Sequence, residues 1–349
     1  MIAPVMLNES NRLTELLSKR PWLLADGATG TNFFAMGLEH GDAPELWNLA
    51  KPEQVRAHYR SFIEAGSDIV LTNTFGGTAN RLKLHGAEDQ VHEINRAAAE
   101  LLRAEIDASG REVVAAGSVG PTGDLMQPLG PLTFDDAVAA FRAQCEGLRD
   151  GGADVAWIET LSSPDELKAA IQGAQEAGME AVCTFSFDTN GRTMMGVTPE
   201  GLVELVRETA RPPLAFGGNC GVGAAELLAA LVKIGRAAGA DDVVVAKANC
   251  GIPEYHDGKI VYSGTEERMA RYAVMARDAG ARIIGGCCGT TPGHVRAMRA
   301  ALQDHEPGEA PSIEAIVAAL GPISYGAEGK QTPASGEGRR SDRRRRRQA

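Results

Sequence analysis

Three cysteines of this chain share a setting that suits metal binding. Cys287 and Cys288 are adjacent, follow a short apolar run and stand among glycines before an expected helix start. Cys220 has a matching position after another apolar run. Three thiolates fill all but one position of a tetrahedral zinc, and an open position is typical of catalytic zinc. Small residues also pack where strands end, but one setting repeated at three cysteines favours zinc.

Three cysteinate ligands would give a zinc site net negative charge, which restricts its chemistry. Such a complex is a poor Lewis acid for making hydroxide, and a zinc hydrolase would normally use histidine and carboxylate ligands. A metal-bound thiol is deprotonated, whereas a free thiol with a pKa of about 8.5 is mostly protonated at neutral pH. The sequence therefore predicts S-alkylation of a small thiol.

Two acidic residues at other expected strand ends indicate the kind of thiol. Asp26 and Glu159 would face the same site and hold an ammonium group, and backbone amides of the glycine-rich turn at Gly27 could receive a carboxylate. Asp26 can also be explained as an Asp-Gly turn or a helix cap. Glu159 ends a very apolar run, where a lone acid is usually bound to a partner. Together they predict a substrate with an amino-acid end.

These residues need elements that bring distant parts of the chain together. Apolar, β-branched runs alternate with segments whose apolar residues recur at helical spacing. The expected strands are 22–26, 68–73, 113–118, 155–159, 181–187, 214–219, 243–247 and 282–286, and the expected helices are 52–65, 88–108, 134–149, 164–177, 199–209, 224–238, 266–279 and 292–303. This α/β alternation predicts a (β/α)8 TIM barrel, whose chemistry gathers at the carboxyl ends of the strands. A doubly wound sheet is the alternative, but the first turn lacks its Gly-x-Gly-x-x-Gly pattern.

Length and composition fit one large domain with a distinct tail. We expect an N-terminal helical extension over 1–20, a barrel over 21–325 and a disordered, arginine-rich tail over 326–349. Because the tail holds seven arginines near its end, the body is more acidic than the net charge of −11 indicates. An acidic body argues against a nucleic-acid-binding core. The tail could contact RNA or anionic lipid, or remain solvated.

The sequence also predicts a cytoplasmic protein that does not enter membranes. No apolar stretch approaches the ~18 residues that a membrane span requires, and no signal-peptide pattern is present. Six cysteines in 349 residues are too few for a disulfide scaffold and indicate a reducing compartment. Cys145 and Cys183 fall within an expected helix and strand and are interpreted as packing residues. The oligomeric state is left open.

Six motifs resemble those of the zinc-dependent homocysteine S-methyltransferases, in the same order. They are Asp26-Gly-Ala-Thr-Gly-Thr, Thr72-Asn-Thr-Phe, Gly117-Ser-Val-Gly-Pro-Thr-Gly, Glu159-Thr, Gly218-Asn-Cys-Gly and Gly285-Gly-Cys-Cys-Gly-Thr-Thr-Pro. The resemblance covers 21 to about 320. It implies a barrel in which Cys220, Cys287 and Cys288 hold Zn²⁺ and homocysteine sulfur takes the open position.

The resemblance also implies roles for other residues around the site. Asp26 and Glu159 would lie near the homocysteine amino group, and Asn73 and Asn219 match motif positions that line the same mouth. Cys250 also follows an apolar run but matches no ligand position. A more remote interpretation is a zinc- or thiol-binding protein without turnover.

The methyl donor is where related enzymes differ. The whole chain resembles most the bacterial betaine–homocysteine methyltransferases, which implies betaine or another onium compound as donor. Aromatic faces commonly bind quaternary ammonium groups, and we expect Trp47 to supply one. Animal betaine enzymes carry tyrosines near the positions of Gly76 and Thr160, so S-methylmethionine or a separate corrinoid protein is the alternative donor.

Overall fold

The computed structural model describes residues 11–188, 190–251, 253–256 and 259–323, so the expected tail at 326–349 lies outside the described residues. Parallel strands form the centre of the molecule: β1 (Leu23–Leu24), β2 (Ile69–Leu71), β3 (Val114–Val119), β4 (Val155–Leu161), β5 (Ala181–Phe185), β6 (Ala215–Cys220), β7 (Val244–Ala248) and β10 (Ala281–Gly286). Their order is β1-β10-β7-β6-β5-β4-β3-β2. A parallel bridge between Ala25 and Ile69 brings the two ends of this sheet together. The predicted barrel is confirmed.

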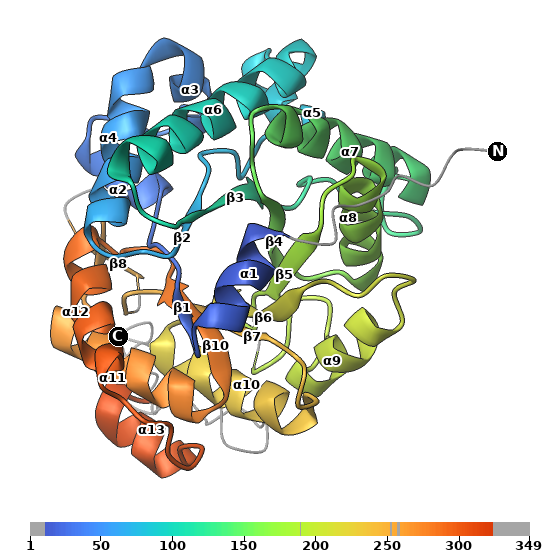
Figure 1. Cartoon of the computed structure of the whole chain (residues 1–349). Helices are drawn as coiled ribbons and strands as arrows, with labels where there is room; N and C mark the ends of the chain where they lie inside the picture. The colour runs from blue at the N-terminus through green and yellow to red at the C-terminus, as the bar shows by residue number, and fades with distance from the viewer. Residues whose placement is uncertain (1–10, 189, 252, 257–258, 324–349) are drawn as a thin grey trace, which may run out of the picture.

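Helices surround the strands, as Figure 1 shows in a view along the barrel. The longer ones are α4 (Pro52–Glu64), α6 (Val91–Ser109), α7 (Phe134–Asp150), α8 (Pro164–Glu176), α9 (Pro199–Arg207), α10 (Ala224–Ala237), α11 (Glu266–Asp278) and α12 (Pro292–Gln303). Several begin at a side-chain cap that the sequence indicated: Ser163 accepts from the Glu166 amide and Thr198 from the Gly201 amide, each followed by proline. Among the described residues, no helix is long and apolar enough to cross a membrane.

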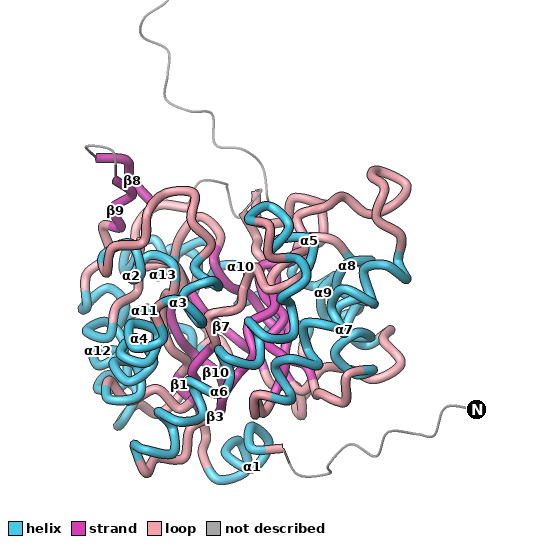
Figure 2. Tube along the Cα trace, turned by 90° about the horizontal axis from the view of Figure 1, so that it is seen from above, coloured by secondary structure: helices cyan, strands magenta, loops and turns pink. Residues whose placement is uncertain are grey.

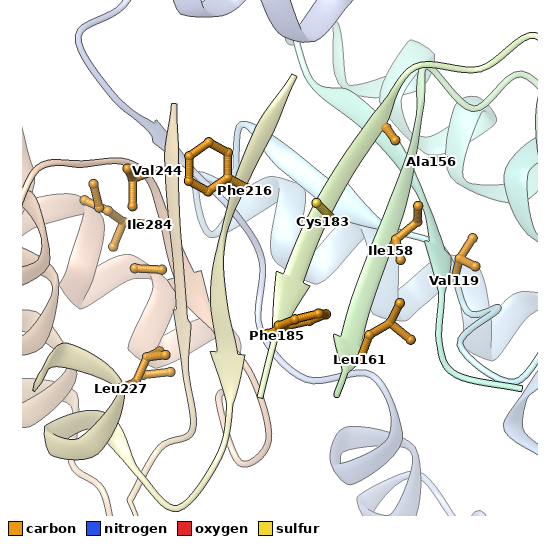
Figure 3. Close-up of a cluster of buried hydrophobic side chains, with 14 of the residues drawn as sticks. Val119, Ala156, Ile158, Leu161, Cys183, Phe185, Phe216, Leu227, Val244 and Ile284 are labelled. Carbon is orange, nitrogen blue, oxygen red and sulfur yellow. The ribbon is translucent and has the colours of Figure 1, made fainter. Parts of the chain in front are cut away.

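The strands separate two layers of apolar side chains. Outward-facing residues such as Ile158, Cys183 and Phe216 pack against the helices (Figure 3). Inward-facing residues such as Val155 and Trp157 form a second cluster inside the barrel. Because side chains alternate along a strand, the next inward position on β4 after Val155 and Trp157 is Glu159. The apolar interior therefore gives way to polar side chains toward the carboxyl ends of the strands.

The two ends of the barrel are covered differently. Helix α1 (Arg12–Lys19) lies over the amino ends, where Leu13, Leu16 and Leu17 join the inner apolar cluster (Figure 1). An antiparallel hairpin of β8 (Pro253–His256) and β9 (Lys259–Tyr262) stands at the opposite end (Figure 2). The hairpin interrupts the passage from β7 to α11 and was not expected from the helical and strand periodicities. The carboxyl ends of the strands thus carry the additional loop structure.

Shorter elements complete the chain around the mouth and the outer surface. These are α2 (Gly30–Ala35), η1 (Pro44–Leu46), α3 (Trp47–Ala50), α5 (Ala79–Leu82), η2 (Lys83–His85), η3 (Glu88–Gln90) and α13 (Ile313–Leu320). Cys145 on α7 and Cys183 on β5 are buried in the outer apolar layer, as expected of packing residues.

Candidate active site at the carboxyl ends of the strands

The three cysteines with metal-binding character come together at the ends of two strands. Cys220 is the last residue of β6, and Cys287 and Cys288 directly follow β10. β7 lies between these strands. Asn249, just after β7, donates to the Gly221 carbonyl at 2.8 Å and accepts from the Cys288 amide at 3.1 Å. One asparagine thereby fixes both cysteine loops, which we call together the cysteine cluster.

The geometry of the cysteine cluster fits zinc. Its three sulfur atoms lie within 4.8 Å of one another, and the Cys220 and Cys288 sulfurs are 3.8 Å apart. Two sulfurs bound at about 2.3 Å to one tetrahedral zinc are separated by about 3.8 Å. Hydrogen bonds from Cys220 and Cys287 lower the pKa of the Cys288 thiol. Hydrogen bonds from Cys287 and Cys288 instead raise the pKa of the Cys220 thiol, and the pKa of Cys287 is raised as well, so one negative charge is favoured among the three sulfurs.

The cysteine cluster opens into a cavity of about 350 Å³. Three polar side chains from the barrel interior, Ser118, Glu159 and Lys247, lie along it, and we call them the floor. The rest of the lining comes largely from loops after β1 and β2 and includes Gly27, Phe34, Glu45, Asn73 and Phe75. This volume suits a small-molecule substrate.

Glu159 on the floor is nearly buried, with 8% of its surface exposed. Its Oε1 accepts a hydrogen bond from the Ser118 hydroxyl at 2.6 Å. Burial raises the pKa of Glu159 to about 7, against the opposing effect of the Lys247 ammonium. A cationic ligand at this point would stabilise the ionised carboxylate.

Asp26 does not face the cavity as Glu159 does. It is fully buried, its Oδ1 lies 2.7 Å from Lys247 Nζ, and its Oδ2 accepts from the Leu71 amide at 2.7 Å. Burial raises the pKa of this carboxyl, and Lys247 opposes that change. Asp26 is therefore already paired, and it is Lys247 that lines the cavity in its place.

The two asparagines of the motifs differ in position. Asn219 lies beneath the surface and braces β4, because it accepts from the Thr160 amide at 3.0 Å and donates to the Thr160 hydroxyl at 2.8 Å. Thr160 has a left-handed backbone, with φ of 65°, so this brace fixes the residue after Glu159. Asn73 lines the cavity, although its side-chain amide is directed to the Pro44 carbonyl at 2.6 Å.

Trp47, the aromatic residue expected beside the methyl donor, does not line this cavity. It is 4% exposed, stacks on Phe33 with ring centroids 5.1 Å apart, and carries Lys51 Nζ 4.1 Å from its ring centroid. The structure places Phe34 and Phe75 at the cavity instead, with 44% and 37% of their surfaces exposed. The large tryptophan ring is used for packing, whereas the two phenylalanines remain accessible.

Glu45 adds an acid to the same wall. It lines the cavity, is 5% exposed, and accepts from the Gly76 amide at 2.6 Å. Burial raises the pKa of this carboxyl. We call Phe34, Glu45 and Phe75 the donor wall, after the role proposed for them below.

Sequence reasoning found the cysteine cluster and Glu159 but missed Lys247 and the donor wall. Lys247 carried a usable signal: it continues the inward alternation of Val243 and Val245 in an otherwise apolar strand. The donor wall carried none, because its members lie on separate loops whose paths are not set by local periodicity.

Comparisons with known proteins agree with this arrangement. The model of a family described as homocysteine S-methyltransferase matches residues 23–302. Two crystal structures of the homocysteine methyltransferase MmuM from Escherichia coli, an oxidized form and a metallated form, are similar at 26% and 27% identity. Both have a TM-score of 0.70, with 83% of this chain and 99% of that chain covered. A methyltransferase from Methanosarcina mazei shares the fold at 14% identity and a TM-score of 0.53, with 83% and 96% covered.

Proposed function

This chain belongs to the homocysteine S-methyltransferase family, and we propose that it is a zinc-dependent enzyme that methylates homocysteine from an onium donor to form methionine. The observation that carries the proposal is the position of the cysteine cluster. It opens into the same cavity as the Glu159 carboxylate, which is hydrogen-bonded to Ser118 through one oxygen, and as the donor wall. Sites for the thiol of the acceptor, for its ammonium group and for a positively charged methyl donor are thus adjacent.

Residues on one side of the cavity suit the methyl acceptor. Cys220, Cys287 and Cys288 would hold zinc, which, when bound, supplies the charge that keeps a coordinated thiol deprotonated at neutral pH. Glu159 offers a carboxylate to the amino group of homocysteine, and the Ser118 hydroxyl fixes its orientation. These contacts would hold the acceptor in one position, which lowers the entropy cost of reaching the transition state.

The donor wall supports a positively charged methyl donor. Aromatic faces attract onium groups, and the Glu45 carboxylate adds negative charge beside Phe34 and Phe75. In the reaction, a sulfur lone pair forms a bond to the methyl carbon, and the bond from that carbon to the onium atom breaks. Its electron pair leaves with the donor, which becomes neutral at that atom. Betaine fits this description, and so does a sulfonium such as S-methylmethionine.

We also propose that the reaction takes place in the cytoplasm. The cysteine cluster needs reduced thiols, and the described cysteines, including Cys145, Cys183 and Cys250, are all free. Free thiols persist in reducing compartments.

A donor panel tests the proposal. The protein with its bound metal is incubated with homocysteine and, separately, with betaine, S-methylmethionine or a methylated corrinoid protein, and methionine is measured. We expect methionine from an onium compound. Turnover with the corrinoid protein alone would overturn the onium donor, and turnover with none of these donors would favour a zinc- or thiol-binding protein without catalysis.

A further inference from the structure

Asn219 connects separate parts of the barrel mouth through one buried side chain. It is the residue before Cys220 at the end of β6, it is fully buried, and it points inward, like Ala215 of the inner apolar cluster. In the sheet, β5 stands between β6 and β4 on one side, and β7 stands between β6 and β10 on the other. The Asn219 amide contacts residues of β4, of β5 and of the loop after β10. One side chain therefore spans the ends of several neighbouring strands.

The hydrogen bonds of Asn219 define the orientation of its amide. Its Oδ1 accepts from the Thr160 amide at 3.0 Å and from the Thr184 hydroxyl at 2.8 Å. Because a backbone N–H can only donate, the atom that faces it must be the oxygen, so Oδ1 and Nδ2 cannot be exchanged. Nδ2 donates to the Thr160 hydroxyl at 2.8 Å and to the Cys287 sulfur at 3.8 Å. The amide thus uses its full hydrogen-bonding capacity within the protein.

Two residues that adjoin Asn219 have an unfavourable backbone. Among the described residues, three other than glycine have a positive φ, and two of these are Thr160, with φ of 65°, and Cys220, with φ of 57°. A left-handed backbone is costly for a residue with a Cβ atom, most of all for a β-branched one, and it persists where the surroundings enforce it. Cys220 is joined to Asn219 by a peptide bond, and Thr160 is held by two hydrogen bonds of the Asn219 amide. Such strain is concentrated at functional sites.

We propose that Asn219 is a positioning residue shared by the cysteine cluster and Glu159. By holding Thr160, it fixes the backbone directly after Glu159, and by donating to the Cys287 sulfur, it orients one of the three metal-binding groups. Hydrogen bonds to metal ligands orient them and tune the metal. This inference rests on the proposed function, and it adds that one side chain, which binds neither the metal nor the acceptor, sets the affinity for both.

Four variants separate the two contacts of Asn219. Asn219→Ala removes both of them. Thr160→Gly removes the backbone strain, because glycine adopts a left-handed conformation without steric cost, and it is made alone and together with Asn219→Ala. Asn11→Ala is the matched control, because the Asn11 amide donates to the Asp154 carbonyl at 2.6 Å and lies at the opposite end of the barrel.

Three measurements are made on each protein. Zinc affinity is measured by competition with a chromophoric chelator, starting from the metal-free protein. Homocysteine affinity is measured by calorimetry on the protein saturated with zinc. The bond to the Cys287 sulfur is monitored by the sulfur-to-metal charge-transfer band of the cobalt(II)-substituted protein, which does not depend on turnover.

Asn219→Ala should lower zinc affinity about ten- to a hundredfold, the usual effect of removing a hydrogen bond to a metal ligand. The charge-transfer band should move to longer wavelength, because a thiolate that loses an N–H donor gives up its electrons more easily. Homocysteine affinity should fall about tenfold, because Thr160 is no longer held in its strained conformation. Adding Thr160→Gly should restore the homocysteine affinity to that of Thr160→Gly alone and leave the band and the zinc affinity changed. Asn11→Ala should change none of the three.

Two results would overturn the shared role while zinc and homocysteine binding by the wild-type protein, and so the proposed function, stand. One is an unchanged charge-transfer band in Asn219→Ala, and the other is a loss of homocysteine affinity that Thr160→Gly does not relieve. If Asn219→Ala does not fold, Thr184→Val, which removes the hydroxyl that donates to Oδ1, should change all three measurements in the same direction by smaller amounts. A wild-type protein that binds neither zinc nor homocysteine would instead refute the proposed function.

Discussion

Two buried aspartates stand at opposite ends of the barrel and have different surroundings. Asp68, at the amino end of β2, has arginine nitrogens 2.7 Å away on Arg20, 2.6 Å away on Arg299 and 3.9 Å away on Arg111. It also accepts from the Leu24 amide at 2.9 Å. Asp26, at the carboxyl end of β1, has one cationic partner within the described part of the chain, Lys247.

The difference teaches how one fold separates stability from ligand binding. At the amino end, cations outnumber the buried acid, so its charge is fully compensated by the protein. At the carboxyl end, Glu159 and Glu45 line a cavity whose described lining includes Lys247 as its cation, and Lys247 is already paired with Asp26 behind it. Buried acids that outnumber the neighbouring cations are typical of functional sites, where side chains are placed for ligand binding rather than for stability.

The largest effect is expected from breaking the cysteine cluster. Cys287→Ala should reduce bound zinc from about one ion per chain to near none, because two thiolates hold zinc poorly. Methionine formation should become undetectable, and zinc is measured by atomic absorption. Cys250→Ala is the control: its sulfur contacts His294 Nε2 at 3.2 Å, outside the cluster, and it should keep its metal. Full zinc retention in Cys287→Ala would disprove the metal site.

A large but different effect is expected at the amino end. Asp68→Asn should lower the free energy of unfolding by about 3 kcal/mol, because it removes a buried partner of several arginines. Urea unfolding measures this loss, and homocysteine affinity should not change. Glu112→Gln, which affects the exposed contact to Arg20 at 3.3 Å, should change the stability far less, because solvent-exposed ion pairs contribute little. An equal loss of affinity and stability in Asp68→Asn would show that the two ends are not separate.

An intermediate effect is expected on the cavity floor. Glu159→Gln should weaken homocysteine binding by about 1.5 to 3 kcal/mol, as for a charge-assisted hydrogen bond, with zinc content unchanged. Calorimetry measures the affinity. Unaltered affinity would mean that Glu159 has a structural role.

The same residue predicts a pH dependence. Burial raises the pKa of Glu159 to about 7, and the Lys247 ammonium opposes this rise. A protonated Glu159 cannot pair with an ammonium, so wild-type affinity should fall as the pH decreases through about 7. Glu159→Gln should lack this step. A step of the same size in both proteins would assign it to another group.

The smallest effect is expected at the donor wall. Phe75→Ala should raise the KM of an onium donor by a factor equivalent to about 1 to 2 kcal/mol of cation–π energy and leave the KM of homocysteine unchanged. Steady-state kinetics with varied donor measure it. Phe134→Ala is a matched exposed control outside the cavity lining, with Phe134 38% exposed. Equal changes in both KM values would remove Phe75 from donor binding.

Much of the site was predictable because it depends on strand ends. Periodicity located the eight strands, and a TIM barrel places the ends of its strands at one mouth. Cys220, Cys287 and Cys288 could therefore be grouped without coordinates. Trp47 and Asp26 could not be assigned in the same way: the first is buried in packing, and the second is turned to Lys247.

The sequence by itself determined which residues stand at the strand ends, because alternation and turn chemistry are local properties of the chain. Only the tertiary structure decided which of them meet. Asp26 and Lys247 are separated by 221 positions, and they touch because β10 alone stands between β1 and β7 in the sheet. The donor wall depends likewise on where loops from different strands converge. Such contacts arise from the packing of whole elements, which no local pattern specifies.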